Sequence, residues 1–114
     1  MIFFKNSVSE NDSSIIHFEA LESDKTIGSC TLVLGDKFAE VTSLTCDEKT
    51  IWAVEGLLKS AYNYAALKNY YMAKCSAKGV ESHLLRMNFL EKNGEYINDI
   101  PTILMGSCSS CSGK

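Results

Sequence analysis

Hydrophobic and polar residues alternate through most of the first 46 positions, and the period then changes. In IIHFEAL (residues 15–21) the even positions are apolar, whereas His17 and Glu19 are polar, which is typical of a half-buried strand. The segments IGSCTLVLG (27–35) and FAEVTSLTC (38–46) predict two more strands, with tight turns at ESDK and GDK between the three. Three strands joined in this way indicate an antiparallel meander.

The amino terminus predicts a short strand followed by a loop. Residues 2–5 are mostly apolar and form the predicted strand. The next segment, NSVSENDSS (6–14), is polar and rich in turn-forming residues, so we expect a loop there.

From Thr50 onward, apolar residues recur at spacings of three and four. This period predicts an amphipathic helix from about residue 48 to 68. Asp47 is placed to cap it, because its carboxylate can accept a hydrogen bond from a free amide of the first turn. The apolar face contains Ile51, Val54, Leu57, Leu58, Ala61 and Ala65.

The remainder of the chain predicts a strand, a short helix and a last strand. They correspond to YYMAKCSA (70–77), ESHLLRMNF (81–89) and GEYINDI (94–100). A helical crossover returns the chain to the same end of a sheet, so the strand after the long helix should run parallel to the one before it. We therefore expect an α+β or mixed α/β fold, with helices on the faces of a mostly antiparallel sheet of about six strands.

Length and composition predict one globular domain over residues 1–105, followed by a flexible Cys/Ser/Gly tail over 106–114. The net charge is −3 and Arg86 is the single arginine, which argues against a nucleic-acid partner. No apolar run approaches the ~20 residues of a membrane span, and the amino terminus does not read as a signal peptide. We expect no membrane partner and a cytoplasmic location.

The order of meander, long helix, strand, short helix and strand resembles the GNAT superfamily of acyl-CoA-dependent N-acyltransferases. The similar segments are SLTCDE at the end of the third meander strand, GLLKSAYNYA in the long helix, and LLRMNFLEKNGEY near the carboxyl end. The resemblance covers residues 15–100. It implies a GNAT-like fold whose partner and cofactor is a small-molecule acyl-CoA such as acetyl-CoA, bound between that meander strand and the helix after it.

In that family the loop before the long helix usually reads [QR]-x-x-G-x-[GA], and its glycines let backbone amides approach a pyrophosphate. Counting back from Leu57, the matching positions here are 49–54. Lys49 replaces the basic residue, but Trp52 and Val54 stand where glycines belong. The cofactor-binding residues that the resemblance implies are Leu44, Thr45, Cys46, Lys49, Thr50, Trp52, Ala53 and Val54.

The family often places a tyrosine in its last helix to protonate the leaving CoA thiolate. The matching position here is Leu84, which cannot donate a proton, and Asn88 replaces a glycine of the same pattern. His83 is adjacent and would take over this role if it turned toward the cleft.

The family also commonly carries two helices before its second strand that help form the acceptor side. The loop over 6–14 is too short for them, so we expect them to be absent.

The polar face of the second predicted strand offers a candidate base. His17 and Glu19 lie on that face two residues apart, so together they could deprotonate an amine. The alternative reading is an ordinary solvated sheet face.

The five cysteines have two readings. Cys46 and Cys75 end neighbouring predicted parallel strands, so their sulfurs could face one cleft, and Cys108 and Cys111 form a C-x-x-C. All four together could make a zinc site if the tail folds back. The default is no metal, because free cysteines are commonly small buried hydrophobes and the tail reads as solvated.

The sequence thus leaves two functions open. The first is an acetyl-CoA-dependent N-acetyltransferase whose amine acceptor is unknown. The alternative is a non-catalytic binding or regulatory module on the same fold, which could hold a metal through its cysteines or form a homodimer through exposed apolar surface.

Overall fold

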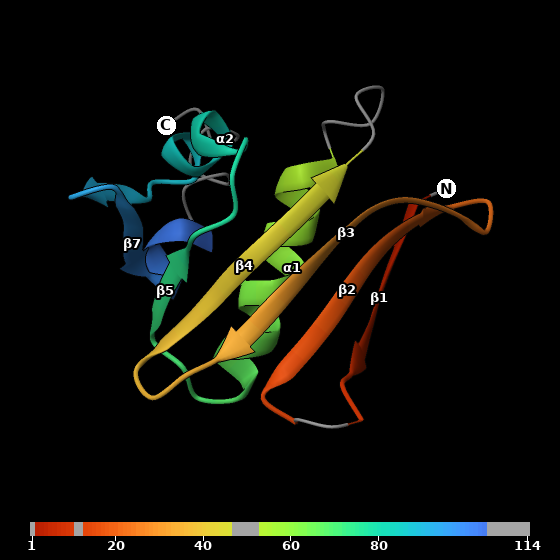
Figure 1. The fold of residues 1–114 in the computed structure, drawn as a ribbon, viewed down its shortest axis with the longest axis horizontal. Coiled ribbons are helices and arrows are strands. Elements are labelled where there is room, and N and C mark those ends of the chain that lie inside the picture. Colours follow the sequence, from red (N-terminus) through yellow and green to blue (C-terminus); the bar gives the residue numbers. More distant parts are fainter. Residues whose placement is uncertain (1, 11–12, 47–52, 105–114) are drawn as a thin grey trace.

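One seven-stranded sheet organises the molecule, in the order β1-β2-β3-β4-β5-β7-β6 (Figure 1). The structure is a computed structural model that describes residues 2–10, 13–46 and 53–104. Within these residues no helix is long and apolar enough to cross a membrane. The elements are β1 (Ile2–Val8), β2 (Ile15–Glu22), β3 (Lys25–Leu34), β4 (Phe38–Cys46), α1 (Ala53–Leu67), β5 (Met72–Cys75), α2 (Glu81–Arg86), β6 (Leu90–Lys92) and β7 (Glu95–Asp99).

The predicted meander and crossover are both confirmed. Strands β2, β3 and β4 pair antiparallel in sequence order, and β5 returns parallel to β4 after α1. The remaining pairs, β1 with β2, β5 with β7 and β6 with β7, are antiparallel. The fold is therefore the expected mixed and mostly antiparallel sheet.

One boundary in the amino-terminal half differs from the prediction. Strand β1 extends to Val8, so residues 6–8 are not part of a loop. They pair with β2, with Ser7 opposite His17 and Val8 opposite Ile16. Pairing to a neighbouring strand satisfies their backbone groups, and this outweighs the polar composition that indicated a loop.

The sheet also has one strand more than the expected six or so. Strand β6 forms a hairpin with β7, and the turn residues Asn93 and Gly94 have φ of 53° and 84°. Positive φ at both central residues is the requirement of the tight hairpin turn that an Asn-Gly pair favours. All three residues of β6 are exposed, so no apolar alternation marks it in the sequence.

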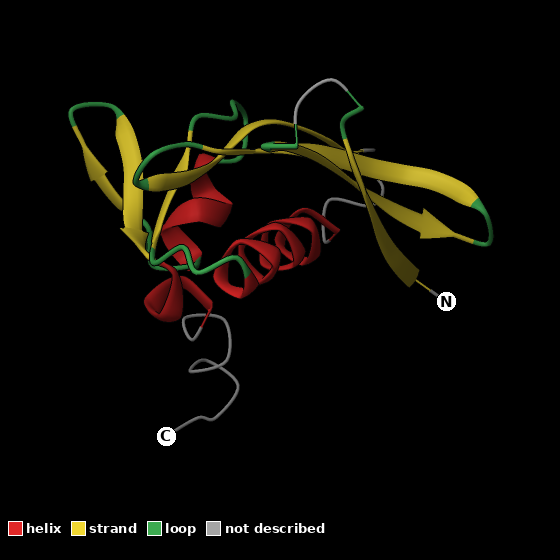
Figure 2. Cartoon of the chain, turned by 90° about the horizontal axis from the view of Figure 1, so that it is seen from below, coloured by secondary structure: helices red, strands yellow, loops and turns green. Residues whose placement is uncertain are grey.

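Helices cover one face of the sheet rather than both (Figure 2). α1 lies across that face, and its buried side chains pack with those of the central strands. α2 lies beyond the carboxyl end of β5 (Figure 1) and buries Leu84 in the same core. In the described part of the chain the opposite face carries no helix.

The carboxyl end of the described chain turns into a further helical segment over residues 100–104. Asp99 caps it, since its Oδ2 accepts a hydrogen bond of 2.9 Å from the backbone N–H of Thr102. Ile100 and Ile103 are buried and join the core on the helix side of the sheet. The tail predicted over 106–114 lies outside the described residues.

Candidate functional site

Strands β4 and β5 separate halfway along β4 (Figure 1). We call the point of separation, at Val41 and Cys75, the fork, and the candidate site lies around it. β4 has nine residues and β5 has four. Their pairing ends at Val41 and Cys75, where the N–H of Ser76 still donates to the Val41 carbonyl at 3.0 Å. Beyond that point β3 accompanies residues 42–46 of β4 on one side. No described strand accompanies them on the other.

A bulge in β4 falls at the same point. Leu32 of β3 pairs with Val41, but Thr31 pairs with Ser43, so Thr42 is the extra residue. A bulge bends its strand and redirects the backbone groups next to it. Strand β4 therefore turns away from the sheet plane where its neighbour β5 ends.

The space beside residues 42–46 is a slot of about 280 Å³. Three elements line it: the end of β4, the first turn of α1, and the loop from β5 to α2. A strand edge without a neighbouring strand offers N–H and C=O groups to an extended ligand. The lining residues are Leu44, Thr45, Cys46, Val54, Lys78, Gly79 and Val80, of which Lys78 is the charged one.

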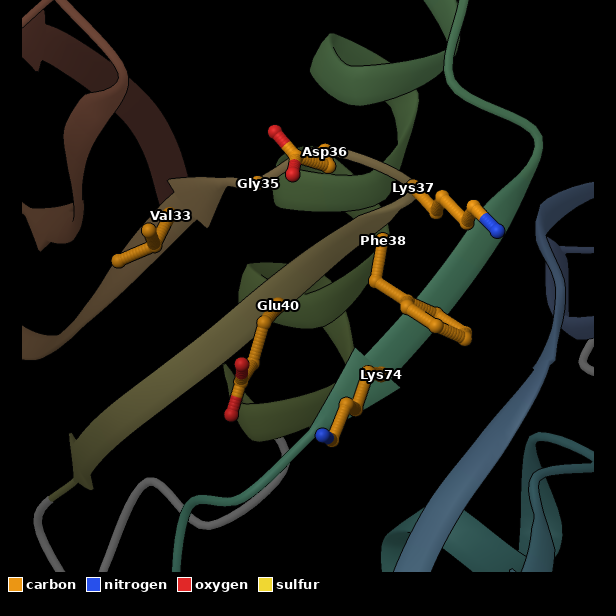
Figure 3. A pocket seen from close by; sticks show the side chains of 7 residues that line it. All are labelled: Val33, Gly35, Asp36, Lys37, Phe38, Glu40 and Lys74. Atoms are coloured by element: carbon orange, nitrogen blue, oxygen red, sulfur yellow. The ribbon is translucent and has the colours of Figure 1, made fainter.

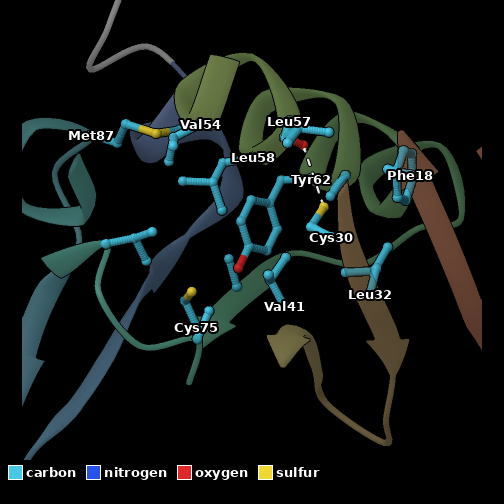
Figure 4. Packing of buried hydrophobic residues seen from close by; sticks show 14 of the residues in the cluster. Phe18, Cys30, Leu32, Val41, Val54, Leu57, Leu58, Tyr62, Cys75 and Met87 are labelled. Carbon is cyan, nitrogen blue, oxygen red and sulfur yellow. Dashed lines mark hydrogen bonds between the residues drawn. The ribbon is translucent and has the colours of Figure 1, made fainter. Parts of the chain in front are cut away.

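Tyr62 of α1 contacts the strands at the fork from the helix side of the sheet (Figure 4). Its side chain is fully buried, and its hydroxyl donates a hydrogen bond of 2.6 Å to the carbonyl oxygen of Lys74 in β5. Burial holds the pKa of Tyr62 well above its usual value of 10.0. The phenol therefore stays neutral and remains a hydrogen-bond donor.

Glu40 lies at the fork on the opposite, helix-free face of the sheet. Its neighbours Ala39 and Val41 are fully buried on the helix side, so the alternation of the strand directs Glu40 the other way. The hydroxyl of Ser76, the residue that follows β5, donates to Glu40 Oε2 at 2.6 Å. A carboxylate and a hydroxyl thus meet where β4 and β5 separate.

The sequence did not single out Glu40. Its alternation in FAEVTSLTC places it on a polar face, but the fork becomes visible only when the end of β5 is known. The glycine at position 79 is a local signal for a turn after β5, and in the structure it has a φ of 83°.

The predicted cofactor residues fall into three groups. Leu44, Thr45, Cys46 and Val54 line the slot. Ala53 is fully buried at the start of α1. Lys49, Thr50 and Trp52 lie outside the described residues.

His17 and Glu19 lie apart from the slot and each has its own partner. The His17 Nδ1 atom is 3.2 Å from Thr31 Oγ1, and Glu19 Oε1 is 3.9 Å from Lys5 Nζ. Both residues belong to β2, which is separated from β4 by β3. The structure does not bring them to the fork.

His83 lies between the two helices. Its Nδ1 atom is 3.1 Å from Glu55 Oε2, and Arg86 approaches the same oxygen to 3.4 Å. Glu55 is in the first turn of α1, so the guanidinium of Arg86 offsets its negative charge there. Leu84, at the position of the family's tyrosine, is fully buried.

The cysteines are spread along the sheet. Cys75 pairs in register with Val41, whereas Cys46 lies at the far end of β4, about 16 Å away at the usual ~3.3 Å rise per residue. Burial raises the pKa of Cys30 to about 12 and that of Cys75 to about 11. Within the described ranges no three His, Cys, Asp or Glu residues gather as metal ligands would. Cys108 and Cys111 lie outside those ranges.

Sequence comparison gives no match to any protein-family model and none to any curated protein. Comparison with solved structures gives several matches. A candidate acetyltransferase of the GNAT family from Desulfovibrio desulfuricans aligns with a TM-score of 0.70 at 9% identity. The alignment covers 88% of this chain and 99% of the other.

Two further similar structures contain a bound ligand. The candidate N-acetyltransferase YhhK from E. coli, bound to coenzyme A, aligns with a TM-score of 0.61 at 10% identity over 87% of this chain and 98% of that one. A GNAT family acetyltransferase from Elizabethkingia anophelis with acetyl-CoA bound aligns with a TM-score of 0.60 at 14% identity. That alignment covers 84% of this chain and 95% of the other. The chain therefore has the fold found in GNAT acetyltransferases.

Proposed function

We propose that the chain binds acetyl-CoA or another acyl-CoA in the slot beside β4 and transfers the acyl group to an amine. One observation carries the proposal: β4 continues past the end of β5 and leaves a strand edge facing a slot that the first turn of α1 closes. Two solved structures with this fold hold coenzyme A or acetyl-CoA.

The slot suits the pantetheine arm of the ligand. Pantetheine is a narrow, extended chain with two amides, so it can hydrogen-bond to residues 42–46 as an added strand would. Leu44 and Val54 supply apolar contact. With the arm in this position the thioester lies toward the fork. Backbone N–H groups near the Thr42 bulge are then the donors for its carbonyl oxygen.

The phosphates of the ligand extend toward the amino terminus of α1. Peptide dipoles place partial positive charge at that end of a helix. Lys78 adds an ammonium group from the loop beside the slot, and the guanidinium of Arg86 offsets the carboxylate of Glu55. Charged side chains thus assist where the glycines of the family loop are replaced by Trp52 and Val54.

Glu40 is the residue best placed to act as the general base. It receives a proton from the attacking amine as the amine nitrogen bonds to the thioester carbon. The carbon–sulfur bond then breaks, and sulfur leaves with the electron pair. A thiol of ordinary pKa, about 8.5, leaves readily as the thiolate and takes its proton from water, so the leucine at position 84 does not prevent the reaction.

Ligand binding is tested by thermal unfolding of the purified chain against rising acetyl-CoA and free CoA. A ligand at a hundredfold excess over Kd stabilises the folded state by about 2.7 kcal/mol, which should raise the midpoint by several degrees. Leu44→Arg fills the slot and should abolish the shift. Leu67→Arg, at an exposed position near the end of α1, is the matched control and should retain it. No shift at millimolar ligand contradicts the proposal.

Acyl transfer is tested separately by the release of free CoA thiol in the presence of primary amines. Glu40→Gln should lower kcat at neutral pH by about a hundredfold or more, while the Kd for acetyl-CoA stays within about twofold. Saturable binding of acetyl-CoA without transfer to any amine would favour the non-catalytic module over the enzyme.

A further inference from the structure

The helix-free face of the sheet has a second hollow, a groove of about 350 Å³ that begins at the fork and extends to the β3–β4 turn (Figure 3). Glu40 and Lys74 lie at the fork end, and Asp36 and Lys37 at the turn. Val33 and Phe38 provide the apolar part of its wall. The volume is at the lower end of the range for ligand pockets, which fits a small molecule rather than a polypeptide segment.

Glu40 and Lys74 are neighbours of opposite charge that do not pair with each other. They are register partners across β4 and β5, and both are flanked by buried residues, so both side chains project from the helix-free face. Yet Glu40 accepts its hydrogen bond from Ser76, and Lys74 Nζ lies 3.3 Å from Glu95 Oε2. The Lys74 ammonium also lies 5.9 Å from the centre of the Phe38 ring.

We infer that this groove binds the acyl acceptor and that the acceptor is a small α-amino acid. Its amino group lies against Glu40 at the fork, its carboxylate pairs with Lys74, and its side chain extends over Val33 and Phe38 toward the turn. This inference rests on the proposed acyl-CoA function and adds the acceptor class to it.

The charge arrangement selects for this class. An α-amino acid carries a cationic and an anionic group on neighbouring atoms, which matches a carboxylate and an ammonium on adjacent strands. A simple alkylamine satisfies Glu40 but leaves Lys74 without an anion from the ligand. A polyamine places further positive charge near Lys74 and Lys37, which is unfavourable.

The reaction balances without a further reactant. The α-ammonium group first loses one proton to bulk water, and the neutral nitrogen attacks the thioester carbon. The N–C bond forms and the C–S bond breaks. The second proton passes to Glu40, and the thiolate is protonated from solvent. The product is an amide without positive charge, so its attraction to the Glu40 carboxylate is lost and product release is favoured.

The test compares three acceptors of one shape with acetyl-CoA as donor: L-leucine, leucinamide and isoamylamine, alongside the other L-amino acids. We expect kcat/KM for the best amino acid to exceed that of its decarboxylated amine by about tenfold or more, because a charge-assisted contact is lost in the amine. Lys74→Met keeps the aliphatic stem and should remove this preference by lowering only the value for the amino acid.

Glu95→Gln is the matched control. It removes the ion-pair partner of Lys74 but retains the ammonium group, so the preference for amino acids should remain. Equal turnover of amino acids and amines would overturn the inference, as would an equal loss on both in Lys74→Met. Acetyl-CoA binding with no amino acid consumed would also overturn it, whereas failure to bind acetyl-CoA would contradict the acyl-CoA proposal itself.

Discussion

The hydroxyl of Tyr62 donates a hydrogen bond of 2.6 Å to the carbonyl oxygen of Lys74, and this bond ties the long helix to the short strand at the fork. Tyr62 comes from α1 and Lys74 from β5, directly before the last residue that pairs with β4. The side chain of Lys74 lines the groove on the other face of the sheet. One backbone unit thus connects the core under α1 to the proposed acceptor groove.

Tyr62→Phe should destabilise the protein by about 1–2 kcal/mol. The ring still fills its place, but a buried carbonyl loses a donor. Denaturant unfolding gives the free energy directly. Tyr71→Phe is the control, because Tyr71 is 63% exposed, and it should change stability by no more than about 0.5 kcal/mol. Equal stabilities for the two variants would show that the Tyr62 bond contributes nothing.

The two buried thiols predict a loss of stability in alkali. The pKa of Cys30 is raised from 9.0 to about 12 and that of Cys75 from 9.0 to about 11, chiefly by burial. The folded protein therefore keeps these protons above the pH at which the unfolded chain releases them. Their contribution is complete below pH 9 and is lost as the pH rises toward 11 and 12.

Cys75→Ala should consequently reduce the slope of unfolding free energy against pH between about 9 and 11, although its cavity lowers stability at every pH. Urea unfolding at several pH values measures the slope. Ala73→Gly, a substitution at a buried position of the same strand without a titrating group, should lower stability with the slope unchanged. An unchanged slope in Cys75→Ala would contradict the assignment.

The meander and the crossover could be predicted because both follow from local patterns. Alternation in β2, the three- and four-residue period of α1 and turn residues between strands each act over a few neighbouring positions. The slot-lining residues of β4 and Val54 were named through the family resemblance, which aligned the end of one strand with the start of one helix.

The position of Glu40 at the fork and the groove beside it could not be predicted from the sequence. YYMAKCSA is apolar or neutral over most of its length, so nothing in it predicts that pairing with β4 stops at Cys75. The contact of His83 with Glu55 likewise depends on how two helices meet. Such relationships are set by tertiary packing, which a single segment does not encode.

The capping carboxylate of Asp99 predicts a second pH effect, at the acid end. Hydrogen bonds from Thr102 lower the pKa of Asp99 below its ordinary value of 3.8. The stabilisation is therefore present above that value and is lost as the pH falls through the lowered pKa. Asp99→Ala should lower stability at neutral pH, whereas Asp99→Asn should retain most of the cap. Chemical unfolding at pH 7 measures the free energy of unfolding of both variants. Equal losses of stability in the two would show that capping is not the cause.

Cys46 provides a direct probe of the slot. Its side chain is partly exposed at the end of β4 and lines the slot, whereas Cys30 and Cys75 are buried with raised pKa values. Thiolates are the reactive form, so in a Cys108→Ser, Cys111→Ser background iodoacetamide should modify Cys46 first in the folded protein. Acetyl-CoA in the slot would cover it, and at a hundredfold excess over Kd the rate should fall by more than about tenfold.

Free adenosine 3′,5′-bisphosphate is the informative control in the same experiment. It carries phosphates of the ligand but no pantetheine, so it should leave Cys46 accessible. Mass spectrometry of tryptic peptides identifies the modified residue. Protection by both compounds would place the phosphates rather than the pantetheine beside Cys46. Protection by neither, at a concentration where acetyl-CoA raises the unfolding midpoint, would place the ligand elsewhere on the molecule.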